Sequence, residues 1–209
     1  MPKIVNHAHR RDEIALAACK VVAAKGFEDA TVALIARSAG YTTGMVAHYF
    51  ATKQAIILAA LRLILQRMDQ RLARPPSRNE AATALLNVLK EALPLDAQRR
   101  AECAFWAAFW GQMSADKRLK RLNVWVHREY LRLFDRCLRE HWPDAGVWPA
   151  ALRCQVLRSL ITFINGITTS AITSPKDWPA IEQVRQLQLQ LNLLHDWAQL
   201  SVPKLTRRV

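Results

Sequence analysis

The sequence predicts an all-α protein of about nine helices, and three observations lead to that expectation. Glycine is scarce, with 6 residues in 209, while 51% of the chain is apolar, a composition that favours helices around a real core. Apolar residues recur at spacings of three and four, as in Ile14, Ala17, Ala18 and Val21, and no useful stretch alternates with period two. Prolines fall between the expected helices or at their starts, where proline is tolerated.

Start and stop signals place the helices along the chain. Gly26 and Gly40 have the residue type that ends a helix, and Thr31, Thr42 and Thr52 have the type that caps a helix start. A loose arm, residues 1–9, is expected before the first helix. The expected helical ranges are 10–25, 31–39, 42–50, 52–73, 79–92, 97–113, 117–141, 149–173 and 179–199.

A break after the fourth helix suggests the domain division. The run Arg74-Pro75-Pro76-Ser77 cannot continue a helix. We therefore expect an arm with a three-helix helix-turn-helix domain at 1–53, a connecting helix at 54–74, and a helical bundle domain at 75–209.

Charge points to a polyanionic partner but does not locate its site. Lys and Arg outnumber Asp and Glu by 30 to 17, a net charge of +13, which implies attraction to nucleic acid or to an anionic lipid surface. Residues 1–53 hold seven basic and four acidic groups, so they carry only +3 of that charge. The polar N-terminus and the lack of an apolar run of about 20 residues lead us to expect a soluble cytoplasmic protein with no membrane partner.

Neither cysteine nor histidine spacing indicates a catalytic or metal site. The cysteines lie within apolar helical patterns, so we expect buried thiols in place of a disulfide framework or a metal site. The histidines lie far apart, without the spacing of a Ser-His-Asp or metal motif. We therefore expect no enzyme, no cofactor and no metal. The residues concerned are Cys19, Cys103, Cys137 and Cys154, and His7, His9, His48, His127, His141 and His195.

The segment Thr31–Lys53 has the layout of a helix pair that inserts one helix into the major groove of DNA. Three threonines stand at helix starts, where free amides and hydroxyls suit phosphate, and a lysine adds charge at the third start. The exposed side chains of the third helix would read base edges. The expected phosphate contacts are Thr31, Thr42, Thr52 and Lys53, and the expected base contacts are Thr42, Thr43, Met45, His48 and Tyr49. The alternative is a helical hairpin inside a core.

This segment resembles the N-terminal domain of the TetR (tetracycline-repressor) family. The residues that carry the resemblance are Ile35-Ala36, Ala39-Gly40, Tyr41, Thr42, Gly44, His48-Tyr49-Phe50 and Lys53. The resemblance implies a ligand-responsive transcriptional repressor that binds a palindromic operator as a homodimer. Two positions depart from the family pattern: Tyr41 replaces a small aliphatic residue, and Ala47 stands where many members have a phosphate-contacting tyrosine. Nonspecific binding to nucleic acid or to anionic membranes remains the alternative function.

An aromatic arc on the helix 97–113 is a candidate effector site. Its rings and one carboxylate would suit a small organic cation, although ordinary core packing explains the same pattern. This part of the chain also resembles the choline-responsive betaine-synthesis branch of the family. Aspartate is frequent in that branch at the position of Asn165, and the neutral residue leaves the effector open. The arc comprises Glu102, Phe105, Trp106, Phe109, Trp110 and Met113, with Asn165 as a further pocket candidate.

Two further patterns lie in the second half of the chain. An arginine stripe on the helix 117–141 predicts a solvated face, with an anionic effector or DNA as alternatives; it comprises Arg121, Arg128, Arg132, Arg136 and Arg139. Apolar faces on the last two helices predict a four-helix dimer interface, with an intrachain bundle as the alternative. The expected interface is Leu152, Val156, Leu160, Phe163, Ile164, Ile167, Ile181, Val184, Leu187, Leu191, Leu194 and Ala198.

Overall fold

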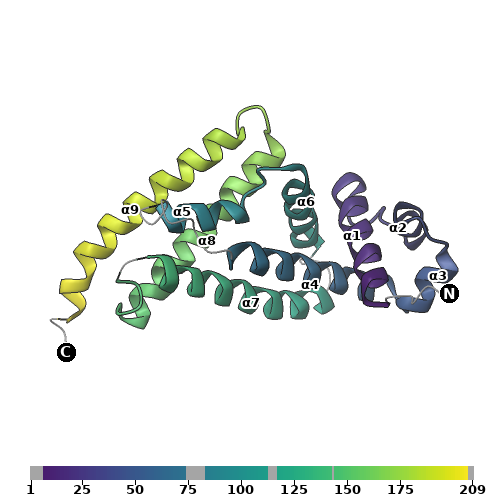
Figure 1. Ribbon diagram of the computed structural model, residues 1–209, viewed down its shortest axis with the longest axis horizontal. Helices are drawn as coiled ribbons and strands as arrows, with labels where there is room; N and C mark the ends of the chain where they lie inside the picture. Colours follow the sequence, from purple (N-terminus) through teal and green to yellow (C-terminus); the bar gives the residue numbers. More distant parts are fainter. Residues whose placement is uncertain (1–6, 74–82, 113–116, 143, 207–209) are drawn as a thin grey trace, which may run out of the picture. The chain divides into compact units, whose positions relative to one another are not determined.

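The computed structural model describes residues 7–73, 83–112, 117–142 and 144–206, and it confirms the all-α class. Within those four ranges the regular structure is helical and there is no strand. The helices are α1 (His7–Lys25), α2 (Val32–Ala39), α3 (Thr43–Tyr49), α4 (Lys53–Leu72), α5 (Ala84–Leu89) with the 3₁₀ turn η2 (Lys90–Ala92), α6 (Ala97–Gln112), α7 (Lys117–His141), α8 (Ala150–Thr173) and α9 (Ala180–Thr206) (Figure 1).

The observed boundaries agree closely with the expected ones, with three differences. Helix α1 begins at His7, so it takes in part of the expected arm. Helix α5 is shorter than expected, and residues 79–82 lie outside the described part of the chain, as does the proposed domain break at Arg74–Ser77. Helix α9 runs to Thr206, beyond its expected end.

The chain divides into two compact units. Unit 1 holds residues 1–67 and 101–126, and unit 2 holds residues 68–100 and 127–209. The division falls inside α4, α6 and α7, because each of these helices has residues in both units. The expected domains 1–53, 54–74 and 75–209 follow chain order instead, and they stay a prediction.

Unit 1 is organised by the first three helices. Helix α1 packs against α2, and α2 packs against α3 (Figure 1). Gly26, with φ at 82°, ends α1 in the left-handed conformation that glycine adopts without strain. The core of this unit is apolar and includes Ile14, Ala18, Val22, Ile35, Val46, Ile56, Ile64, Phe105 and Phe109.

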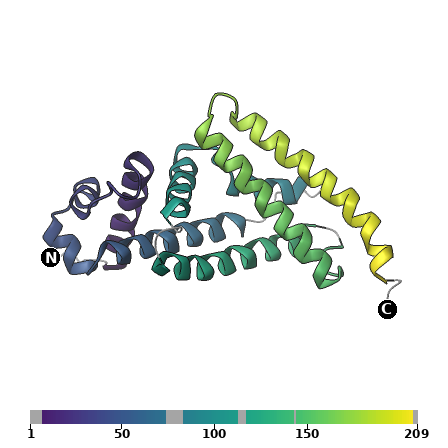
Figure 2. The ribbon, with the colours of Figure 1, turned by 180° about the vertical axis from the view of Figure 1, so that it is seen from behind.

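Unit 2 is dominated by the hairpin of α8 and α9, which lie side by side in both views (Figures 1 and 2). Among the described helices, α8 alone is long and apolar enough to cross a membrane, or two segments are if the bent pair α3–α4 counts as one. Only 44% of the α8 window is buried. A core helix passes the same test, and α8 buries one of its faces against α9.

The cysteines are only partly as expected. All four are free thiols, and Cys19, Cys103 and Cys137 are buried, whereas Cys154 is exposed on α8. Burial raises the pKa of Cys19 to about 12 and that of Cys137 to about 11. These two thiols therefore stay protonated at neutral pH. No group of three or more metal-ligating side chains occurs among the described residues.

Candidate nucleic-acid interface

The turn between α2 and α3 has the geometry that the sequence predicts. Gly40 adopts φ 75° and ψ 27°, a left-handed conformation, and its N–H donates to the Arg37 carbonyl over 3.1 Å. The N–H of Tyr41 donates to the Ala36 carbonyl over 2.9 Å. Together these bonds close α2 with a Schellman motif, which satisfies two carbonyls at its C-terminus. The turn directs the chain straight into the start of α3.

Threonine caps three helix starts, as the sequence predicts. The hydroxyl oxygen of Thr31 accepts from the Leu34 N–H over 3.2 Å, and that of Thr42 accepts from the Met45 N–H over 3.2 Å. Thr52 caps α4 in the same way through a 3.1 Å bond to an amide one turn later. All three threonines are exposed, so each hydroxyl hydrogen remains on the surface beside free helix amides. That combination suits a phosphate oxygen.

Helix α3 buries only one of its seven residues, Val46, and turns its other side outward. Thr43 and His48 are exposed, and Met45 and Tyr49 are half-buried. The structure thus gathers the expected base-reading side chains on one short helix with a free face. Their contacts with DNA remain a prediction.

Gly44 does not have the packing role that its size suggests. A residue as small as glycine in a helix pair can allow the two helices to approach closely. A side chain carbon built at Gly44 would meet only the Thr42 hydroxyl, at 4.0 Å, and the residue is exposed. That explanation is therefore wrong, because the neighbouring helix leaves room for a larger residue.

The ammonium of Lys53 is already hydrogen-bonded within the protein. It donates to the Phe27 carbonyl over 2.6 Å and to the Glu28 carbonyl over 3.3 Å, and it lies 5.1 Å from the centre of the Phe27 ring. Partial burial lowers the pKa of Lys53. In this arrangement the ammonium fixes the start of α4 to the loop before α2, so a phosphate would have to share it with two carbonyls.

The start of α1 is the part of this site that sequence reasoning missed. The ring of His7 lies 5.6 Å from that of Tyr49 and 6.5 Å from that of His48, and the two α3 rings are 5.4 Å apart. Nearby, Arg11 donates to the Tyr49 carbonyl over 2.5 Å. The available signal was Asn6, a residue type favoured at helix starts, which would have moved the expected start of α1 to His7.

The aromatic arc of α6 lies largely within the core of unit 1. Glu102, Phe105, Trp106 and Phe109 are buried, whereas Trp110 is half-buried and Met113 lies outside the described residues. The Trp106 ring meets Phe109 edge-on at 6.0 Å and lies 6.1 Å from Trp110. The rings of Trp106, Phe109 and Trp110 form one contiguous cluster, and the burial of most of the arc favours the core-packing interpretation. Its role as a ligand pocket stays a prediction.

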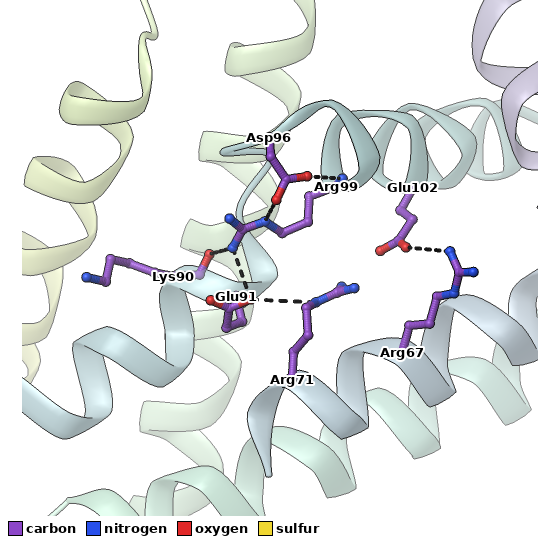
Figure 3. A network of polar contacts seen from close by, with 7 residues as sticks. All are labelled: Arg67, Arg71, Lys90, Glu91, Asp96, Arg99 and Glu102. Carbon is purple, nitrogen blue, oxygen red and sulfur yellow. Dashed lines mark hydrogen bonds and ion pairs between the residues drawn. The ribbon is translucent and has the colours of Figure 1, made fainter. Parts of the chain in front are cut away.

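The carboxylate of the arc already faces a cation. Figure 3 shows Glu102 turned toward Arg67 of α4, with Oε1 and Nη1 separated by 3.7 Å. Glu102 is only 3% exposed, and its charge also acts to raise the pKa of the Cys19 thiol on α1, after burial itself. An organic cation at this carboxylate would therefore compete with Arg67. Asn165 lies half-buried on α8, in unit 2.

A second charged cluster joins the end of α4 to the start of α6 within unit 2. Glu91 lies between two arginines, 3.8 Å from Arg71 and 3.1 Å from Arg99 (Figure 3). Arg99 also pairs with Asp96 over 2.8 Å and donates to the Lys90 carbonyl over 3.2 Å. These ion pairs give partners to four charged side chains to which the sequence assigned no role. They also hold the η2 turn against α4 and α6.

The arginine stripe of α7 is partly neutralised. Arg136 pairs with Asp69 of α4 over 2.5 Å, and that hydrogen bond raises the pKa of Arg136. Arg132 pairs with Glu129 over 2.6 Å, and Arg139 pairs with Asp135. Arg121 and Arg128 are exposed. The solvated-face interpretation thus holds for some members only, since Arg136 fastens α7 to α4.

The predicted dimer face mixes two sides of the α8–α9 hairpin. Most of its members are buried within the single chain: Leu152, Val156, Leu160, Ile164, Ile167, Leu187, Leu191, Leu194 and Ala198. Because these side chains are not exposed, a second copy cannot contact them, and the intrachain-bundle alternative accounts for them. Phe163 and Val184 are half-buried. Four exposed apolar side chains of α9 share another side of that helix, hereafter the α9 stripe: Leu189, Leu193, Trp197 and Leu200. Ile181, the remaining member of the predicted face, is exposed near the start of α9 on a different side.

Two family models match the chain one after the other. One, of bacterial regulatory proteins of the tetR family, matches residues 14–60, which include α2 and α3. The other, of the C-terminal part of BetI-type transcriptional repressors, matches residues 81–194, more than half of the chain.

Individual proteins give the same picture over nearly the whole length. The chain is 27% identical over 213 residues to the HTH-type transcriptional regulator BetI of Proteus mirabilis (strain HI4320), covering 94% of this chain and 98% of that protein. The crystal structure of a transcriptional regulator from Rhodococcus sp. Rha1 is similar, with a TM-score of 0.72 and 25% identity over 88% of this chain and 95% of that one.

A third neighbour was crystallised with a small molecule. It is a transcriptional regulator from Saccharomonospora viridis in complex with choline, with a TM-score of 0.70 and 19% identity over 87% of this chain and 94% of that one. At that identity the likeness shows a shared fold.

Proposed function

The chain belongs to the TetR family of bacterial transcriptional regulators, as a DNA-binding repressor with a BetI-type C-terminal domain, and from that premise we propose how it reads DNA and responds to a ligand. Helix α3 enters the major groove and reads base edges with its exposed residues. Thr31 and Thr52 hold phosphates through their hydroxyls and helix amides. The observation that carries this proposal is a short helix with one buried residue, set between two threonine-capped helix starts.

A selection experiment tests which residues read the sequence. Duplexes enriched from a randomised library by the full chain give the operator, and we expect a palindrome with half-sites about one DNA turn apart. His48→Ala and Thr43→Ala should each weaken binding to that duplex by about 1–3 kcal/mol and relax the preference at one base pair per half-site. Thr173→Ala, the same change of an exposed threonine on α8, is the matched control. An unchanged preference in both α3 variants would contradict the proposal.

The chain acts as a homodimer through the hairpin of α8 and α9. The α9 stripe is exposed and apolar; for example, Leu193 is 56% exposed and Leu200 is 70% exposed. The hairpin also carries a groove of about 440 Å³ lined by residues of both helices and of the loop between them, including Phe163, Trp178 and Gln190. Two such hairpins packed together form a four-helix interface with a two-fold axis. The symmetry of this interface matches that of a palindromic operator.

The repressor responds to a small molecule that changes the separation of its two α3 helices. Three residues separate the end of α3 from the start of α4, and α4 runs twenty residues to Leu72. A ligand that favours a different tilt of α4 would weaken operator binding by its differential affinity for the two states. The aromatic cluster of α6, with Glu102, Trp106 and Trp110, is the candidate ligand site, and an organic cation is the first class to test.

Choline is the appropriate first probe, because one structural neighbour holds it. We expect choline to weaken binding to the selected duplex by about 5- to 150-fold. Trp106→Ala should abolish that response while leaving the affinity without ligand intact, and Trp125→Ala, which changes an exposed tryptophan outside the arc, should preserve the response. Identical operator affinity across choline, other quaternary ammonium compounds, and neutral and anionic ligands would argue against this mechanism.

A further inference from the structure

Helix α1 contacts both ends of the recognition helix α3 through residues that lie close together in sequence. On the side where α3 begins, the hydroxyl of Tyr41 donates to the carboxylate of Glu13, and the guanidinium of Arg10 lies 5.2 Å from the centre of the Tyr41 ring. Tyr41 stands directly before the cap residue Thr42, so this contact fixes the turn that leads into α3. The hydrogen bond to Glu13 also raises the pKa of Tyr41.

At the other end of α3, a single arginine makes two contacts. Arg11 donates from Nη1 to the Tyr49 carbonyl over 2.5 Å, and its guanidinium carbon lies 4.2 Å from the centre of the Phe50 ring. The last carbonyls of a helix lack partners within the helix and carry partial negative charge, so a cation is favourable there. Phe50 is buried, which gives the guanidinium a fixed ring face to lie on. Arg11 therefore joins α1 to the C-terminus of α3.

Helix α3 needs such contacts because its own packing is slight. It has seven residues, of which only Val46 is buried. A helix of that length is about 10 Å long, so a shift of about 1 Å at one end tilts it by about 5°. Hydrogen bonds to base edges depend on placement at that scale. One buried side chain near the middle of the helix leaves its tilt undetermined, whereas one contact at each end determines it.

We propose that Tyr41 with Glu13, and Arg11 with the Tyr49 carbonyl, form a two-point clamp that sets the tilt of α3 for base reading. The four residues are positioning residues: they act through the placement of Thr43, Met45 and His48 on α3. This proposal rests on the proposed role of α3 in reading DNA. It assigns a reason to Tyr41, which stands where the family pattern has a small aliphatic residue, since such a residue has no hydroxyl to donate to Glu13.

The test separates positioning from direct contact and from simple stability. Tyr41→Phe removes only the hydroxyl, and Arg11→Met removes the guanidinium but keeps an unbranched apolar stem. Both are made in the full chain, singly and together. Affinity is measured for the selected palindrome and for a shuffled duplex of the same composition, over a range of salt concentrations, and the thermal midpoint of each variant is recorded.

We expect each single variant to bind the palindrome three- to tenfold more weakly and the double variant at least tenfold more weakly. Binding to the shuffled duplex and its salt dependence should stay as in the parent, because no phosphate contact is lost. Arg11→Lys, which can still donate to the Tyr49 carbonyl, should recover part of the loss. Arg37→Met, the same loss of charge at an exposed position of α2, controls for charge and should leave the ratio of the two affinities unchanged.

Three results would overturn the clamp. Equal losses for both duplexes with a shallower salt dependence would make Arg11 a phosphate contact. Losses for both duplexes that follow the fall in thermal midpoint, with their ratio unchanged, would make these residues merely structural. Unchanged affinities throughout would show that neither contact is needed to set the tilt of α3. Failure to enrich any duplex is a separate result, because it would remove the base-reading role of α3 before any clamp variant is made.

Discussion

The α2–α3 segment and the α8–α9 hairpin differ in how their sequences specify structure. In the first, single residues determine the backbone: Gly40 takes a left-handed turn, and Thr31 and Thr42 cap the two helices. In the second, two long helices carry apolar residues on more than one face, and the structure buries one face within the chain while leaving the α9 stripe exposed. Local backbone rules need no partner to be interpreted. An apolar helix face, by contrast, can be interpreted only when the surface that packs against it is known.

The buried face of α9 should account for the largest single effect on stability. Leu187 is fully buried between the helices of unit 2. Leu187→Ala removes apolar contacts and leaves a cavity, so we expect the free energy of unfolding to fall by about 2–5 kcal/mol in denaturant titrations. Gln188→Ala, a change at the adjacent half-buried polar position, should fall within about 0.5 kcal/mol of the parent. A loss below about 1 kcal/mol for the leucine variant would show that the two faces of α9 have been assigned the wrong way round.

The α9 stripe should affect association more than folding. Leu193 is 56% exposed in one chain, and a homodimer through this face would bury it. Leu193→Asp places a charge in that interface, so we expect the dimer dissociation constant to rise at least about 30-fold, a loss of 2 kcal/mol or more. Sedimentation velocity over a concentration series measures the dimer dissociation constant. Thermal or denaturant unfolding curves show whether the variant still unfolds cooperatively.

The control for that change is a charge introduced at an exposed position of unit 1, outside the α8–α9 hairpin. Lys20→Asp alters an exposed residue of α1 and should leave the dimer constant unchanged. If Leu193→Asp remains a dimer with parental affinity, then the α9 stripe is not the contact between copies, and the proposed interface is wrong.

The contrast between the two regions also explains how far the sequence could be interpreted. Helix boundaries followed from glycine, proline and threonine, and the expected range of α7 matches the observed one. Burial of Glu102 beside Arg67 could not be predicted, because it depends on two helices far apart in sequence meeting in space. The contact of Arg11 with the end of α3 and the contact of Tyr41 with α1 were hidden for the same reason. Of the expected base-reading residues on α3, Thr43 and His48 are exposed and Met45 and Tyr49 are half-buried, and their role in reading DNA stays a prediction.

The two glycines of the recognition segment should respond oppositely to the same change. At Gly40, φ is 75° and a side chain carbon would meet nothing within 4 Å, so Gly40→Ala would cost only backbone strain, about 1–2 kcal/mol of unfolding free energy. Gly44 lies within α3 with open space around it, so Gly44→Ala should stabilise the fold by about 0.5–1 kcal/mol. Thermal unfolding of the two variants side by side measures the difference, and a shift of the same sign in both would contradict the assignment of the turn.

A similarly small effect is expected at the cap of α3, where Thr42 can stabilise the helix and can also contact DNA. Its hydroxyl oxygen accepts from the Met45 amide, so Thr42→Ala should lower the unfolding free energy by about 1 kcal/mol, the usual cost of losing such a cap. Thr42→Ser keeps the hydroxyl and should stay within about 0.5 kcal/mol of the parent, whereas Thr43→Ala, one residue on, removes no cap. If Thr42→Ala weakens operator binding at a temperature where the variant is still fully folded, while Thr42→Ser binds as the parent does, the hydroxyl is needed for DNA binding as well as for stability. If both variants bind alike, capping is the whole of its role, and base reading rests on the residues that follow it along α3.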